Sequence, residues 1–191
     1  LMSWHKPLLG TLLLTWTALA FAQPPAPASP LPPLVIEDRG ELLLENDSFS
    51  YAPWSADANP GKVHIVQYFG ATRSDSKLFE AFTDRLQETF EQGQYHITTI
   101  INLDAALWGT TGLVVSELQD NKRKFPNATM VLDEEGSGVK QWQLGKNGAG
   151  LAILDAKGTV HYFTGEGMTE EEINSSVALV KEQIDACLKF C

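Results

Sequence analysis

The stretch VHIVQYFGATRSDSKLFEAF at residues 63–82 decides the fold. It opens with VHIVQYF, whose β-branched and aromatic residues are typical of a buried strand. The polar loop ATRSDS follows, and apolar residues then recur at steps of three and four from Phe79 to Phe90. This spacing predicts an amphipathic helix over about residues 75–90. A strand, a short polar loop and a helix in this order begin an α/β unit, which needs a central sheet with helices packed on it.

Similar patterns alternate along the rest of the chain. Strands are predicted over residues 95–103, 128–133, 151–155 and 159–163, and helices over residues 111–124 and from Thr169 onward. The last helix begins with a capping box formed by Thr169 and Glu172. Upstream, VIEDRGELLL predicts two short strands around a turn at residues 38–40. Alternating units favour parallel pairing and the late hairpin adds antiparallel strands, so we expect an α/β, thioredoxin-like fold with a mixed central sheet and helices on both faces.

The first 22 residues are typical of a secretory signal peptide. Lys6 precedes an apolar run that ends on the small residues Ala20 and Ala22. The run is shorter than the ~20 apolar residues that span a bilayer, although an uncleaved anchor is the alternative. Residues 23–33 are rich in proline, so we expect them to be extended and to bury little surface. Residues 34–191 are then expected to form a single thioredoxin-like domain.

The charge balance is acidic and argues against a nucleic-acid partner. The chain has 14 basic and 24 acidic residues, and removal of the first 22 residues takes away only Lys6, which leaves a formal net charge of −11. Nucleic-acid phosphates require clustered Lys and Arg. The one basic run, residues 122–124, is better explained as the last turn of a helix, where the dipole stabilises cations.

Several stretches resemble a known family. IEDRGELLLENDSFSY, GKVHIVQ, TTIIN, SELQDNKRKFP and LAILD are similar to the YtfJ family of small proteins exported to the periplasm of Gram-negative bacteria. The part from Phe125 to the final helix also resembles, in its pattern, the C-terminal half of thioredoxin-like peroxidases and thiol oxidoreductases. The resemblance implies a thioredoxin-like fold and a periplasmic location, and it carries over no activity and no catalytic residues.

The active relatives carry a cysteine between the first long strand and its helix, where the helix N-terminus lowers the thiol pKa. Residues 71–74 of this chain, ATRS, contain no cysteine. Alignment on LAILD also places Ala149 where those relatives carry a cis-proline. We therefore expect a fold that has been kept after its redox chemistry was lost.

The same loop allows two interpretations of its polar residues. Thr72, Ser74 and Ser76 can simply cap the start of the helix with solvated hydroxyls. Alternatively, these hydroxyls, Arg73 and the N–H groups of the helix N-terminus bind a carboxylate or a phosphate-like anion. Because the chain as a whole is negative, such a site has to be local.

Cys187 and Cys191 lie four residues apart on the apolar stripe of the last helix. A regular helix separates such Cβ atoms by about 5–6 Å, too far for a disulfide, but unwinding of the last turn permits one in an oxidising compartment. The two residues can also be reduced core thiols, or part of a redox or metal site. No metal site is favoured, because two thiols leave zinc half coordinated and His64, His96 and His161 lie on separate predicted strands.

These observations favour a soluble, monomeric periplasmic protein with a redox-inactive thioredoxin-like domain that serves as a binding or structural module without a cofactor. The expected partner is another periplasmic protein or a small anionic ligand. The alternative is a periplasmic thiol-disulfide oxidoreductase or peroxidase-like enzyme that uses Cys187 and Cys191.

Overall fold

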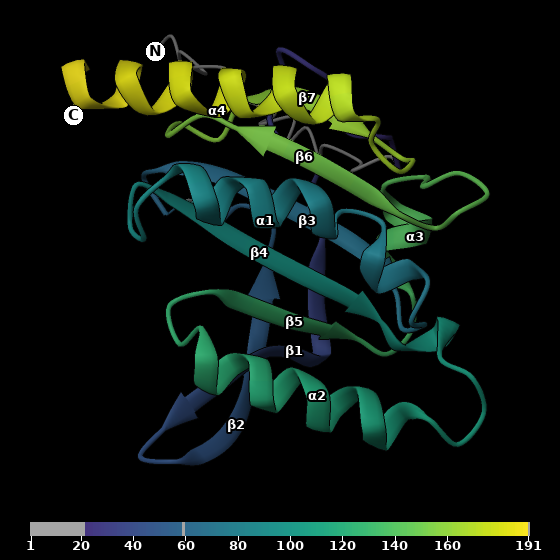
Figure 1. The fold of residues 1–191 in the computed structure, drawn as a ribbon. Coiled ribbons are helices and arrows are strands. Elements are labelled where there is room, and N and C mark those ends of the chain that lie inside the picture. Colours follow the sequence, from purple (N-terminus) through teal and green to yellow (C-terminus); the bar gives the residue numbers. More distant parts are fainter. Residues whose placement is uncertain (1–21, 59, 191) are drawn as a thin grey trace, which may run out of the picture.

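One sheet of seven strands forms the centre of the computed structural model, which describes residues 22–58 and 60–190 (Figure 1). The strands lie in the order β2-β1-β5-β4-β3-β6-β7. Their bounds are β1 Val35–Glu45, β2 Ser48–Ser55, β3 Val63–Gly70, β4 Tyr95–Asn102, β5 Thr129–Asp133, β6 Gly150–Leu154 and β7 Val160–Thr164. The helices are α1 Glu80–Thr89, α2 Thr111–Lys124, α3 Ser137–Gln141 and α4 Glu170–Phe190, with the short 3-10 helices η1 Asp75–Lys77 and η2 Leu103–Ala105. β3, β4 and β5 pair in parallel and the other neighbours pair antiparallel, which confirms a mixed, thioredoxin-like sheet.

The helices divide unequally between the two faces of the sheet. α1, α2 and α4 lie on one face, where their apolar side chains and those of the strands form the larger core cluster (Figure 1). The other face is covered by α3 and by residues 22–34, whose Leu31 and Leu34 belong to a second cluster together with Trp142. Helices therefore occupy both faces, as expected, but the three long ones share a single face.

The segment that was expected to form two short strands is the single strand β1. The expected turn at residues 38–40 is a bulge within β1. Gly40 has a φ of 72°, and a Cβ at this position would collide with the carbonyl oxygen of Ala52. Glycine is thus required for the bulge and does not mark a chain reversal. The chain reverses at residues 46–47, which both have positive φ, as in a type I′ hairpin turn.

Residues 23–33 are mostly exposed, as expected, but the segment is fixed to the domain by hydrogen bonds and by two buried prolines, Pro25 and Pro32. Ala28 N donates to Val160 O at 2.8 Å, which joins this segment to the edge strand β7. Pro32 is buried, and its carbonyl oxygen accepts a hydrogen bond of 2.9 Å from Trp142 Nε1. Proline lacks an N–H donor but keeps its carbonyl acceptor, so a proline-rich segment can still be fixed to a sheet edge and to an indole.

A buried carboxylate links the centre of the sheet to α3. Asp133, at the end of β5, is fully buried and accepts a hydrogen bond of 2.8 Å from Tyr68 Oη. It also accepts hydrogen bonds of 2.9 Å from the backbone N–H groups of Ser137 and Gly138, at the start of α3. Burial and Asp133 raise the pKa of Tyr68, which keeps the phenol protonated as a donor. The Tyr68 ring lies so close to Gly138 that a Cβ there would overlap it.

Two histidines lie side by side near the beginning of the parallel strands. His64 on β3 is opposite His96 on β4, with ring centroids 5.3 Å apart. Their Nε2 atoms are hydrogen-bonded to Thr98 Oγ1 at 2.8 Å and to Thr129 Oγ1 at 2.9 Å, respectively. Burial and the neighbouring His96 lower the pKa of His64 to about 3, and burial and Lys62 lower the pKa of His96. These imidazoles are therefore neutral, hydrogen-bonded groups, with His64 buried and His96 half-buried.

The Tyr68→Phe substitution tests the buried carboxylate link. We expect it to lower the free energy of unfolding by about 1–3 kcal/mol, because the buried Asp133 carboxylate loses a donor. The matched control is Tyr162→Phe, which removes a buried hydroxyl that faces Thr164 and Ser176 without a hydrogen bond of regular geometry, so its loss of stability should be smaller. Chemical denaturation of both variants measures the difference, and equal losses would contradict the role of Asp133.

The stability of the fold should depend on pH through His64. The unfolded chain takes up a proton near pH 6.5, whereas the folded chain takes it up only near pH 3, so protonation favours unfolding. The free energy of unfolding should therefore fall as the pH drops from 6.5 towards 3, at up to roughly 1.4 kcal/mol per pH unit. His64→Gln keeps a group that can bond Thr98 but does not titrate, and it should flatten this part of the curve. Parallel curves for the two proteins would rule the explanation out.

Candidate functional site

The connection after β3 occupies the place where the sequence predicted a thiol-free helix start. Ala71 is buried, and its N–H donates to Asn102 O at 3.0 Å, which fixes the loop beside the end of β4. Thr72 Oγ1 lies 3.0 Å from Ser74 Oγ and accepts from Asp75 N at 3.2 Å. The hydroxyls thus bond within the loop itself, although Ser74, the N-cap residue of η1, makes no side-chain capping bond.

The helix that was expected over residues 75–90 is broken into two pieces. η1 has only three residues, and α1 begins at Glu80, after Phe79 with φ −117° and ψ 5°. The rings of Phe79, at the break, and of Phe82, in the first turn of α1, are both buried in the core. A turn of three residues aligns few peptide dipoles, so the helix-terminus argument for an anion at Thr72, Arg73, Ser74 and Ser76 loses its physical basis.

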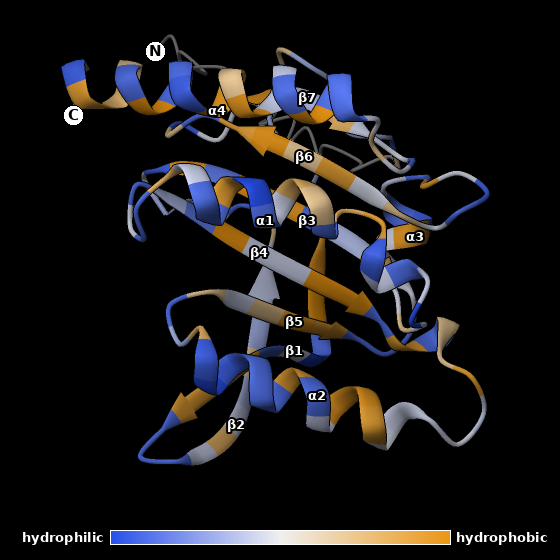
Figure 2. Ribbon diagram, in the orientation of Figure 1, coloured by the Kyte–Doolittle hydropathy of each residue, from blue (hydrophilic) through white to orange (hydrophobic). Residues whose placement is uncertain are grey.

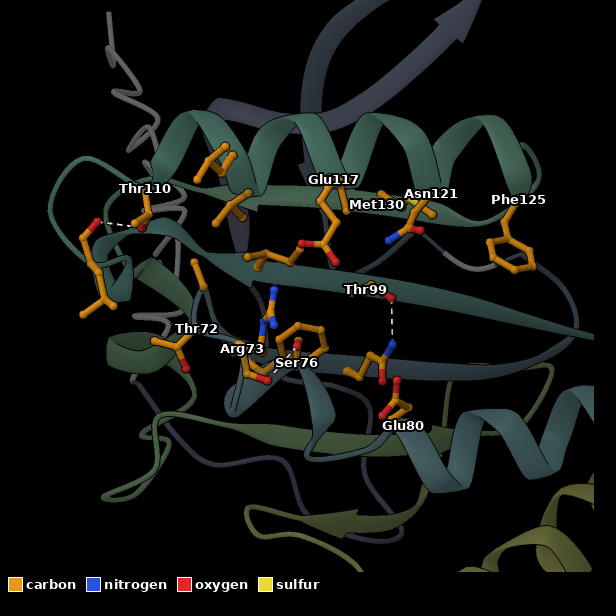
Figure 3. A pocket seen from close by; sticks show the side chains of 18 residues that line it. Thr72, Arg73, Ser76, Glu80, Thr99, Thr110, Glu117, Asn121, Phe125 and Met130 are labelled. Carbon is orange, nitrogen blue, oxygen red and sulfur yellow. Dashed lines mark hydrogen bonds between the residues drawn. The ribbon is translucent and has the colours of Figure 1, made fainter.

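Three of these loop residues line a cavity of about 500 Å³ on the face of the sheet that carries the long helices. The cavity lies between η1 and α1 on one side and α2 on the other, as the side chains in Figure 3 show. Its floor is formed by side chains of the sheet that are largely buried: Gln67, Phe69, Thr99, Ile101 and Met130. Its walls include Thr72, Arg73, Ser76 and Glu80 on one side and Leu113, Glu117 and Asn121 on the other.

A second cavity of about 710 Å³ continues towards the opposite end of the strands. It shares Gln67, Thr99, Phe125 and Met130 with the first, so the two form one elongated depression. We call the two together the α1–α2 groove. Figure 1 shows β4 and β5 between the two helices along the length of this groove.

The groove contains charges of both signs. Arg73, Glu80 and Glu117 point into it from three different elements (Figure 3). None of the ion pairs found among the described residues includes any of the three. On the floor, Gln67 Nε2 donates to Thr99 Oγ1 at 2.8 Å. The arrangement can thus offer carboxylates, a guanidinium and an amide–hydroxyl pair to a bound molecule.

Large apolar side chains are exposed at the rim beside α2. Leu107 and Leu113 line the groove and are 67% and 72% exposed, and Trp108, next to Leu107, is fully exposed. Figure 2 shows the hydrophobic start of α2 at this rim and the hydrophilic second half of the same helix. Exposed apolar groups that cluster beside a cavity mark an interaction site more often than scattered ones do.

Cys187 lies away from the groove. Cys187 is half-buried near the end of α4, and Cys191 lies outside the described residues, so their pairing stays a prediction. The start of α4 lies beside the loop, because Leu78 contacts Gly167 and Arg85 bonds Glu170. Cys187 comes 17 residues after Glu170, which corresponds to about 26 Å along the helix.

Two further features of a redox or metal site are absent from the described part of the chain. No cis peptide bond occurs there, and Ala149 is buried just before β6. No group of three or more His, Cys, Asp or Glu side chains is placed to hold a metal ion among the residues described.

Within the described residues, no helix has the length and apolar character needed to cross a membrane. The predicted signal peptide lies almost entirely outside the described residues.

Sequence reasoning found the loop side of the groove and missed its α2 side. Glu117 and Asn121 lie on α2. The periodicity of this helix predicted that one of its faces is apolar, but it did not predict that these two polar side chains line a groove. One signal was present: residues 105–116, AALWGTTGLVVS, carry no charge in a chain that is 20% charged. An uncharged run with a tryptophan in its loop indicates an exposed apolar surface once it is known to lie outside the core.

A cysteine placed in the β3–α1 loop would test whether the loop still lowers the pKa of a thiol. Thr72→Cys, made together with Cys187→Ser and Cys191→Ser, should have a thiol pKa near the ordinary value of about 8.5, because η1 is too short to stabilise a thiolate. Thiolate absorbance at 240 nm as a function of pH measures it. A pKa below about 7 would show that the loop retains the electrostatics of a redox site.

Comparison with known proteins gives a family and a fold. Residues 27–183 match the family described as "Bacterial protein of unknown function (YtfJ_HI0045)". "Uncharacterized protein YtfJ" from Escherichia coli is 30% identical over 153 residues, which cover 80% of this chain and 83% of that protein. An uncharacterized protein from Haemophilus influenzae is 25% identical over 151 residues, which cover 78% and 82% of the two chains.

Solved structures with a similar fold include two thiol-disulfide proteins by description. A proposed thiol:disulfide interchange protein DsbE from Chlorobium tepidum has a TM-score of 0.52 at 12% identity, over 86% of this chain and 99% of that one. A proposed protein disulfide isomerase from Bacteroides thetaiotaomicron has a TM-score of 0.52 at 14% identity, over 87% and 95%. At such identities the likeness shows the fold alone. The chain therefore belongs to the YtfJ family and has a thioredoxin-like fold.

Proposed function

We propose that this chain is an exported periplasmic protein that binds another molecule in the α1–α2 groove and performs no thiol redox chemistry. The observation that carries the proposal is the open groove beside a β3–α1 connection that has no thiol. The groove is concave, it combines apolar and polar side chains, and it lies next to the exposed residues Leu107 and Trp108. These are the properties expected of a binding site on a rigid sheet.

The periplasmic location is supported by the sequence. Lys6, the apolar run that follows it and the small residues at its end have the order of a secretory signal. The resemblance to exported YtfJ proteins supports the same location.

The absence of thiol redox chemistry is supported by geometry. Catalytic thiols need an exposed thiolate in an electropositive environment. Cys187 is half-buried in the last part of α4, where the negative end of the helix dipole disfavours a thiolate. The place where thiol-active thioredoxin-like proteins carry their cysteine, after the first long strand, is occupied here by Ala71 and Thr72.

Redox activity is tested with insulin reduction and peroxide turnover. We expect no turnover above the uncatalysed rate, and the Cys187→Ser, Cys191→Ser double variant should behave like the unsubstituted protein. Turnover that disappears in the double variant would refute the proposal and support an oxidoreductase.

Binding in the groove is tested by photocrosslinking in living cells. A photoreactive phenylalanine analogue at Asn121, on the groove wall, should give a crosslinked adduct in the periplasmic fraction. The control position is Ser175, which is exposed on α4 and does not line the groove. Adducts at both positions, at Ser175 alone or at neither would count against a binding site in the groove, and recovery from the cytoplasm would count against export.

A further inference from the structure

We propose that the α1–α2 groove receives an extended polypeptide segment of another protein, and that this segment carries basic side chains between apolar ones. The inference rests on the proposed function, because it names the class of partner that the same groove binds. Four features of the groove support it: its length, its floor, its rim and its charges.

The groove is long enough for a polymer. Its two cavities share four lining residues and together reach from Leu107 and Thr110, near the start of α2, to Gln92 and Asn127, at the opposite end of β4. β4 has eight residues, which corresponds to a length of about 26 Å at ~3.3 Å per residue. A small metabolite would fill one end of such a depression, whereas an extended segment of about eight residues matches its whole length.

The floor can bond the main chain of such a segment. Gln67 uses Nε2 to donate to Thr99 Oγ1, so the amide oxygen of Gln67 and the hydroxyl hydrogen of Thr99 are directed to other groups. Together they supply one acceptor and one donor where the two cavities of the groove meet, since both residues line both cavities. A peptide unit carries the complementary N–H and C=O groups.

The rim fits apolar side chains. Leu107, Leu113 and Phe125 all line the groove and all remain exposed, with Phe125 at 39%. They lie at both ends of α2, so an extended segment would meet apolar surface at two points along its length. Burial of apolar side chains at these points would provide the main gain in free energy.

The charges of the first cavity favour a basic partner over an acidic one. Glu80 on α1 and Glu117 on α2 stand on opposite walls, and neither takes part in an ion pair among the described residues. A basic side chain placed between them could bond either carboxylate, and the acidic balance of the whole chain adds attraction for a cationic partner. Two cations also line the groove. Lys62 lines only the second cavity, at the opposite end, so the first cavity has two carboxylates and one guanidinium. The guanidinium of Arg73 can donate to main-chain carbonyl oxygens of the same segment.

A bilayer surface fits these observations less well. Trp108 and Leu107 would suit a membrane interface, but the two carboxylates on the walls would face the negative headgroups of an anionic bilayer. A bilayer also cannot reach the polar floor at Gln67 and Thr99. The membrane is therefore an outcome that the experiment has to separate.

The test uses three synthetic decapeptides that share their Leu and Val residues and carry Lys, Glu or Ser at the positions between them. Binding is followed by backbone amide chemical shifts of the protein. The Lys peptide should bind most tightly and should shift the amides of residues 73, 80, 99 and 117. Tighter binding of the Glu or Ser peptide, or shifts confined to other faces, would overturn the proposal.

Two double variants measure how much Glu80 and Glu117 contribute to the affinity for the Lys peptide. Glu80→Gln with Glu117→Gln should weaken the Lys peptide by roughly tenfold, since two partly exposed ion pairs are lost, and should leave the Ser peptide unchanged. Glu88→Gln with Glu91→Gln removes the same charge from exposed positions outside the groove and should change little. Equal weakening by both variants would show a long-range charge effect and would overturn the assignment to the groove.

Two further experiments distinguish failure of the basic-polypeptide proposal from failure of the proposed binding function. Vesicles of phosphatidylglycerol and phosphatidylethanolamine should leave the same amides unshifted, and vesicle binding without peptide binding would overturn the polypeptide assignment. If Asn121 crosslinks in cells to a small molecule or to an acidic segment, the binding function stands and the basic polypeptide is wrong.

Discussion

The rest of the architecture depends on the buried carboxylate of Asp133. A charged group in a core is tolerated only when hydrogen bonds replace its lost hydration. Asp133 accepts from Tyr68 in the middle of the sheet and from two backbone N–H groups at the start of α3. It therefore fixes α3 to one face, and the buried Trp142 at the end of α3 in turn holds Pro32 through its indole N–H. One face of the sheet is thereby closed by a short helix and a proline-rich segment.

Closure of that face leaves the three long helices on the other one, where the connections dictate their order. β3, β4 and β5 are parallel neighbours in sequence order, so α1 and α2, which connect them, must cross on the same face when both crossovers are right-handed. α1 packs against α4, and Arg85 bonds both Glu170 and Asn174 of that helix. α2 packs on β1 instead. The two helices are held by different partners, and the groove is the part of the sheet that neither covers.

Elements with strong local signals could be predicted from the sequence. Residues 111–124 form the predicted helix with the predicted bounds, because Pro126 follows shortly after its end and its apolar residues are periodic. The capping box is present, with Thr169 N bonded to Glu172 Oε2 at 2.8 Å and Glu172 N bonded to Thr169 Oγ1 at 3.3 Å. In these cases the determining contacts lie within a few residues of one another, so the pattern contains them.

Features that depend on distant contacts could not be predicted in this way. Gly40 signalled a turn, but its permissive backbone serves a bulge against Ala52 on the neighbouring strand. The periodic residues from Phe79 onward predicted one helix that begins at about residue 75, although the chain breaks at Phe79, whose ring is buried. The groove was also out of reach, because Arg73 and Glu117 are brought together by two crossovers over one sheet.

The broken helix explains why the groove, and not the loop, is the part of this fold suited to recognition. A redox thioredoxin-like site concentrates its chemistry at one helix tip, where aligned peptide dipoles act on one sulfur. Here η1 is too short for such a dipole, and the hydroxyls of the loop bond one another. With no concentrated electrostatic centre, affinity has to come from many weak contacts spread over a surface. The elongated groove with its apolar rim and separated charges is the surface of the described chain that provides this.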